Sequence, residues 1–82
     1  MKETLINQYL KIEPIVYDGF IASQKESYEE KGVVIAKDEA ITNIPIGATV
    51  SFDSFMVKKY PTSEIGKFAW YIHYDEIVSY EN

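Results

Sequence analysis

The sequence predicts a small all-β (mostly β) protein, because short apolar segments separated by turn residues run along the chain and no segment keeps a helical period. Its 82 residues allow a single domain, residues 1–82. Aromatic residues make up 15% of the chain, and they favour the half-buried surfaces of strands. Five or six short strands joined by turns are typical of a small barrel or sandwich.

The first half of the chain predicts two strands. Residues 9–16 alternate apolar with charged side chains, and Pro14 indicates a strand end or an edge position there. Residues 18–19, Asp-Gly, indicate a turn. Residues 33–36 form a continuous apolar run, which predicts a second strand that is buried on both faces.

A polar connection and a turn then lead to a third strand. Residues 37–43 are mostly polar, and residues 44–47, Ile-Pro-Ile-Gly, predict a turn. Residues 49–53 alternate strictly, so we expect Val50 and Phe52 to face the core.

The last third of the chain is the richest in strand signals. Residues 55–60 are expected to continue the sheet as far as a proline, and residues 62–67 form a loop. Residues 68–74 are rich in aromatic side chains and predict the strongest strand, with Phe68, Trp70, Ile72 and Tyr74 on one face and Ala69, Tyr71 and His73 on the other. Residues 75–76 predict a tight turn or one helical turn, and residues 77–80 a final strand.

Composition argues against several functional classes. The net charge is −5, and all eight cations are Lys, so the chain lacks the Arg that usually reads phosphate and guanine. An acidic chain without Arg is a poor candidate for binding nucleic acid. No run of 18 apolar residues exists, and the first residues lack the apolar stretch of a signal peptide. We therefore expect no membrane partner and a cytoplasmic protein.

The residues for catalysis or metal binding are also scarce. The chain has no Cys and one histidine, His73, so a Cys nucleophile, a disulfide and a zinc site are not expected. No G-x-S-x-G nucleophile motif is present, and the four glycines are isolated from one another. We interpret His73 as a structural strand residue. The chain is expected to bind a partner without being an enzyme, and to need no cofactor or metal.

One apolar island lies in an otherwise polar stretch. Phe20, Ile21 and Ala22 follow a turn signal and precede a hydrophilic segment that ends at Gly32. The island could be a short strand that covers a barrel end, since exposed apolar residues are common. It could also be a recognition segment that orders as it enters an apolar groove. Both interpretations stay open at the level of the residues.

In order and spacing, the segments together resemble a GroES-type co-chaperonin, the lid subunit of a chaperonin folding cage. The resemblance runs from about Tyr9 to Tyr80. It rests on an ordered series of motifs: Leu10-Lys11-Ile12-Glu13-Pro14, Gly19-Phe20-Ile21-Ala22, Lys31-Gly32-Val33-Val34-Ile35-Ala36, the run from Ile44 to Phe52, and the closing Trp70-Tyr71-Ile72, Asp75-Glu76-Ile77 and Val78-Ser79-Tyr80. Phe52-Asp53-Ser54-Phe55 and Lys59-Tyr60-Pro61 resemble the divergent versions carried by bacteriophages.

The resemblance implies a partly open GroES-like β-barrel with a shortened mobile loop and no roof hairpin. It implies that the protein binds a GroEL-type chaperonin ring, assists ATP-dependent folding, and forms a homo-oligomer, usually a heptamer, in the cytoplasm of a host cell if phage-encoded. The implied chaperonin contact is Gly19, Phe20, Ile21 and Ala22. In the family the first strand pairs with the last strand of a neighbouring subunit, which implies a subunit interface at Leu10, Ile12, Ile77, Val78 and Tyr80.

Two departures from the family pattern indicate a possible second function. The loop before Gly19 is short, and residues 38–43 are too few for a roof hairpin. The same barrel could therefore serve as a structural or assembly protein, for example within a virion, without binding a chaperonin.

Overall fold

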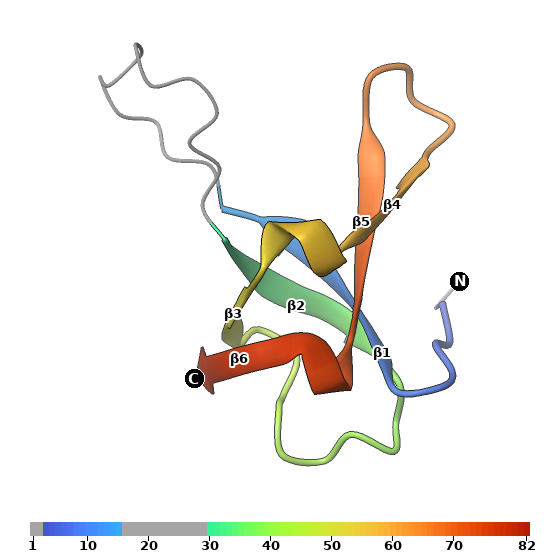
Figure 1. The fold of residues 1–82 in the computed structure, drawn as a ribbon. Coiled ribbons are helices and arrows are strands. Elements are labelled where there is room, and N and C mark those ends of the chain that lie inside the picture. Colours follow the sequence, from blue (N-terminus) through green and yellow to red (C-terminus); the bar gives the residue numbers. More distant parts are fainter. Residues whose placement is uncertain (1–2, 16–29) are drawn as a thin grey trace, which may run out of the picture.

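Six antiparallel strands form one sheet in the computed structural model of this protein, which describes residues 3–15 and 30–82 (Figure 1). The strands are β1 (Tyr9–Pro14), β2 (Lys31–Lys37), β3 (Thr49–Phe52), β4 (Lys58–Pro61), β5 (Phe68–His73) and β6 (Ile77–Glu81). Two single-turn 3-10 helices join them, η1 (Ser54–Met56) and η2 (Tyr74–Glu76). The strand order is β4-β5-β1-β2-β3-β6, and the sheet does not close on itself. The all-β prediction is confirmed, and the open sheet is consistent with a partly open small barrel.

The strand that was predicted across residues 55–60 begins later than expected. Ser54–Met56 instead forms η1, because the Asp53 side chain accepts a hydrogen bond of 3.0 Å from the Phe55 backbone N–H and caps the turn. The chain becomes extended only at β4, which ends at Pro61. The turn predicted at residues 75–76 is present as η2.

The core gathers side chains from several strands and from the connection between β2 and β3. Val50 and Phe52 face it, as their alternation predicted, and Leu10 and Ile72 lie fully buried beside them. These residues belong to a cluster that comprises Leu10, Ile12, Val34, Ile41, Ile44, Ala48, Val50, Phe52 and Ile72. Strands β1, β2, β3 and β5 thus each direct at least one side chain into the same core.

Strand β2 is not buried on both faces, contrary to the sequence prediction. Val34 is fully buried, but Ile35 is 44% exposed. The β1–β2 register shifts by one residue at this point, so Ile35 is skipped in the pairing and falls outside the regular alternation of the strand. Gly32, the second residue of β2, has no room for a side chain, because a Cβ there would come within 3.1 Å of Ile12 and of the Glu13 carbonyl oxygen.

The connection between β2 and β3, residues 38–48, contains no strand, which agrees with the expected absence of a roof hairpin. Lys37 holds this connection in place, since its Nζ donates hydrogen bonds of 2.7 Å to the Ile41 carbonyl and 2.8 Å to the Ile44 carbonyl. Both isoleucine side chains are thereby set in the core. The connection ends at the predicted turn, where Gly47 has φ +98°.

The segment before β1 folds back through a tight turn. Asn7 and Gln8 both have a positive φ, 59° and 63°, and the Tyr9 N–H donates to the Ile6 carbonyl at 3.2 Å. The Gln8 N–H donates to Asp38 at 2.7 Å, and its carbonyl accepts a 2.8 Å bond from the Tyr74 N–H. The folded-back residues 3–6 form the N-terminal arm of the structure.

Candidate partner-binding surfaces

The segment with the predicted chaperonin contact leaves the sheet from two neighbouring strands. Pro14 of β1 pairs with Gly32 of β2, and the Ile15 N–H donates to the Lys31 carbonyl at 3.1 Å. The four predicted contact residues, Gly19, Phe20, Ile21 and Ala22, lie outside the described residues. What the structure places is their point of attachment, at the end of the sheet where β1 ends and β2 begins, here called the β1–β2 end.

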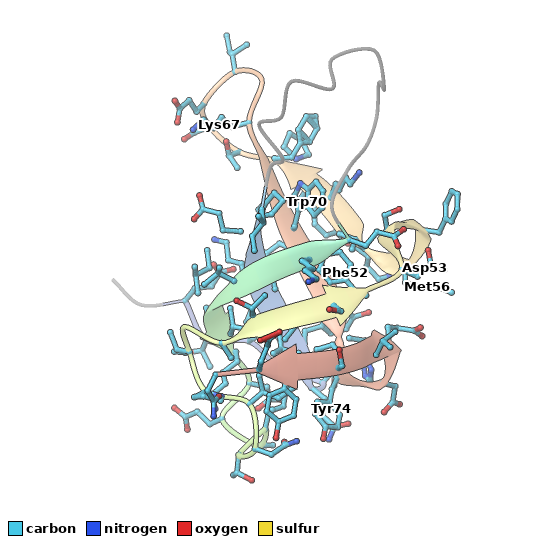
Figure 2. The ribbon with its side chains drawn as sticks, turned by 90° about the vertical axis from the view of Figure 1, so that its left-hand side faces the viewer. Phe52, Asp53, Met56, Lys67, Trp70 and Tyr74 are labelled. Atoms are coloured by element: carbon cyan, nitrogen blue, oxygen red, sulfur yellow. The ribbon has the colours of Figure 1, made fainter. Side chains whose placement is uncertain are left out.

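Two strongly exposed apolar side chains stand at the β1–β2 end. Ile65 is 97% exposed in the loop between β4 and β5, and Phe55 is 89% exposed on η1. They are the most exposed large hydrophobic side chains in the described part of the chain. Figure 2 shows that their elements are separate projections: Lys67 marks the β4–β5 hairpin and Met56 marks η1.

The β4–β5 hairpin presents Ile65 on a well-bonded turn. The Thr62 N–H donates to the Lys67 carbonyl, and the Lys67 N–H donates to the Glu64 carbonyl, each at 3.1 Å. The Thr62 hydroxyl is within 3.2 Å of the carbonyls of Glu64 and Lys67, and it accepts from the Glu64 N–H at 3.1 Å. Gly66 supplies the positive φ that closes the turn. Sequence reasoning placed this loop correctly but did not single out Ile65.

Strand β6 carries three of the five predicted interface residues and is an outer strand of the sheet. Ile77 packs against the core, while Val78 is 77% exposed and Tyr80 is 40% exposed. Even-numbered residues of β3 bond toward β2, as in the 3.0 Å bond from the Phe52 N–H to the Glu30 carbonyl. Tyr80, opposite Val50, therefore turns its backbone N–H and C=O to the open side of the sheet.

A groove of about 520 Å³ runs beside this outer strand. Asn43, Ile44 and Tyr74 line one part of it, and the residues from Ile77 to Tyr80 line the other. The Asn43 side-chain N–H donates to the Tyr74 hydroxyl at 3.0 Å, which ties the 38–48 connection to η2. A strand that paired with β6 would therefore also lie beside this groove.

The other two predicted interface residues lie elsewhere. Leu10 is fully buried and Ile12 is 2% exposed, both in the core of the chain itself. Strand β1 also pairs on both sides, with β2 and with β5, so it has no open edge for a neighbouring subunit. The prediction that Leu10 and Ile12 belong to the subunit interface is therefore corrected: both are core residues. Their side chains lie in the same buried cluster as Val34 and Ile72.

The N-terminal arm is fixed by a small charged cluster that the sequence reasoning missed. Glu3 accepts a 2.9 Å bond from the Lys11 ammonium and a 2.8 Å bond from the Tyr71 hydroxyl. The bonds from Lys11 and Tyr71 lower the pKa of the Glu3 carboxyl, and the bond to Glu3 raises the pKa of Lys11. Burial, followed by its bond to Glu3, raises the pKa of Tyr71. These charges secure the arm across β1 and β5.

His73 takes part in the fold of the chain around η2. Its Nδ1 accepts a 3.0 Å hydrogen bond from the Asp75 backbone N–H and so caps η2. Its ring also meets Tyr9 edge-on, with 5.0 Å between the ring centres. Within residues 3–15 and 30–82, no three His, Asp or Glu side chains converge in a way that could hold a metal ion. This geometry fits the structural role that was expected of His73.

No protein-family model matches the chain, and no curated protein matches its sequence. Among the described residues, no helix has the length and apolar character needed to cross a membrane. The candidate binding surfaces of this protein are the β1–β2 end and the outer strand β6.

Proposed function

We propose that this protein is a co-chaperonin-like lid subunit that binds a chaperonin ring and assists ATP-dependent protein folding. The observation that carries the proposal is the pairing of Pro14 with Gly32 at the β1–β2 end. Because the two strands are bonded there, residues 16–29 start and finish on a fixed base, and they include the apolar triplet Phe20-Ile21-Ala22. An apolar segment on a fixed base is suited to enter an apolar groove of a larger partner.

The proposal includes assembly into a ring, for which β6 offers the surface. Its outer side carries Val78 and the outward backbone groups of Tyr80, beside the groove described above. A neighbouring copy that covered this strand would also add buried area to a small domain. Several copies of a weak apolar anchor would then bind a symmetric partner together, with an avidity that one copy lacks.

The test is co-elution of the purified protein with a GroEL-type chaperonin in the presence of ATP, together with the chaperonin ATPase rate. We expect the wild-type protein to co-elute and to slow the ATPase, and Ile21→Asp to abolish both effects because a carboxylate cannot enter an apolar groove without cost. Ser23→Asp is the matched control, since it adds the same charge without removing an apolar side chain. Failure of the wild-type protein to bind, or unchanged binding by Ile21→Asp, would refute the proposal.

A specific observation favours a second function. Strand β1 is paired on both sides, so the family's pairing of first and last strands is not open to this chain. The alternative is a GroES-like barrel that serves as a phage structural or assembly protein. Light scattering of the native protein separates the two: a heptamer favours the lid, while a monomer or incorporation into particles favours the alternative.

A further inference from the structure

We infer that the tip of the β4–β5 hairpin is a second apolar contact for the same ring-shaped partner, with Ile65 as its anchor. This inference rests on the proposed function and adds to it a site that none of the sequence motifs indicated. The partner surface that it requires is an apolar groove or ledge next to the one that receives residues 19–22.

The first argument is the position of the tip. Strands β5 and β1 are antiparallel with Ile12 opposite Trp70, so Phe68 lies level with Pro14. Pro14, Glu64, Lys67 and Phe68 line one shallow groove of about 310 Å³, which confirms that the hairpin and the end of β1 are neighbours. The hairpin then continues past that level to Ile65, as Figure 1 shows for the loop between β4 and β5.

The second argument is reach. Ile21 follows Ile15 by six residues, so even a fully extended chain carries it at most about 20 Å from the β1–β2 end. Ile65 is three residues beyond Phe68, and a turn of that size extends up to about 10 Å past the same level. A partner surface that lies within about 10 Å of the β1–β2 end can therefore meet both Ile21 and the hairpin tip.

The third argument is the chemistry of the tip. Turn positions favour Pro, Asn, Asp, Ser and Gly. The geometry of the turn therefore does not explain why Ile65, a β-branched apolar residue, stands there with 97% of its surface exposed. The hydrogen bonds of Thr62 hold the turn in one shape, which lowers the entropy lost when it docks. Glu64 and Lys67 flank Ile65 with opposite charges, and Phe68 adds a half-exposed ring. Such a tip fits an apolar surface with no strong charge of either sign.

The experiment compares the affinities of four proteins for a GroEL-type chaperonin with ATP: wild type, Ile21→Asp, Ile65→Asp and Ser63→Asp. We expect Ile65→Asp to bind at least tenfold more weakly than wild type, because a buried apolar anchor is replaced by a carboxylate. Ser63→Asp puts the same charge in the same loop and should bind within twofold of wild type. Thermal unfolding should be unchanged in both, since both positions are exposed.

The outcomes separate the two proposals. If wild type binds and Ile65→Asp binds equally well, the hairpin contact is refuted while the proposed function stands. If wild type does not bind at all, both are refuted. Because the chain has no Cys, Ile65→Cys can also carry a single polarity-sensitive dye. A blue shift of its emission on addition of the ring supports the contact, and an unchanged spectrum refutes it.

Discussion

In the described part of the chain, Asn7 and Gln8 are the two residues other than glycine whose backbones lie in the left-handed region. Two consecutive residues with a positive φ form a type I′ turn, whose twist matches that of an antiparallel hairpin. Glycine is strongly preferred at the second of these positions. Asn tolerates the conformation, whereas Gln has no special compensation for it. Strain is therefore concentrated at Gln8.

We predict that Gln8→Gly stabilises the protein by about 0.5–1 kcal/mol, which corresponds to a few degrees in Tm. The backbone bonds of Gln8 with Asp38 and Tyr74 involve only its N–H and C=O, so glycine keeps both. Thermal and urea unfolding would measure the change. Gln8→Ala is the control and should show no gain, because alanine keeps the strain. A destabilised glycine variant would contradict the prediction.

At the scale of single residues, sequence reasoning succeeded where alternation was strict. Val50 and Phe52 face the core as predicted. It failed at Ile35, which is 44% exposed, since a local register shift cannot be read from an apolar run. It also gave Leu10 and Ile12 the wrong role, because a chain sequence does not say which strands flank β1.

Among the elements, the N-terminal arm depends on pH through the carboxyl of Glu3. Its Glu3 carboxyl has a lowered pKa in the folded protein, chiefly through the bond from Lys11. A group with a lowered folded pKa stabilises the fold above its unfolded pKa, about 4.3 for Glu, and this contribution is lost as the pH falls through the folded value. The arm should therefore loosen in acid.

We predict that the free energy of unfolding of the wild-type protein falls more steeply between about pH 5 and pH 3 than that of Glu3→Gln. Urea unfolding at a series of pH values measures this difference. Glu39→Gln is the control, since Glu39 is exposed and, within residues 3–15 and 30–82, its side chain forms no ion pair or hydrogen bond. Parallel curves for wild type and Glu3→Gln would show that the Glu3 carboxylate does not hold the arm.

The order of elements was largely predictable, and the exceptions share a cause. Strands and turns with a clear apolar period or a proline stop appear where they were expected. The exceptions are η1, set by the Asp53 cap, and the Asn7–Gln8 turn. Each depends on a hydrogen bond between a side chain and the backbone or on an unusual φ, and neither leaves a periodic signal in the sequence.

For the whole molecule, the outer strand β6 is the surface on which proposed assembly depends. We predict that Val78→Lys lowers the mass of the native particle to that of a monomer, because a lysine on an edge strand opposes the addition of another strand. Light scattering with a chromatographic column measures the mass. The fold should be unaffected, since Val78 is 77% exposed.

Phe55→Lys is the matched control for this prediction. It replaces another exposed apolar side chain with the same cation, but η1 lies away from the β6 groove. Its particle mass should equal that of wild type. A Val78→Lys protein that keeps the wild-type mass would exclude β6 from the subunit interface.

The candidate sites were less predictable than the fold. Composition indicated a binding protein and the motif order suggested the region around Gly19, but these residues lie outside the described part of the chain. The sequence did not indicate Ile65 as a contact residue, because single apolar residues are common in exposed loops. Its significance comes from the β4–β5 hairpin, which brings it to the β1–β2 end, and long-range placement of that kind depends on strand order.

Pro61 has a consequence for how the protein behaves when it is concentrated. The 3.1 Å bond from the Thr62 N–H to the Lys67 carbonyl fixes the alternation of β4, so the Pro61 nitrogen, which bears no hydrogen, lies on the outer side of that strand. Fibrils grow when the same sheet accepts further strands without limit, and a missing donor interrupts that ladder. The β4 border therefore resists cross-β growth, and crowded copies can extend the sheet in one direction at most.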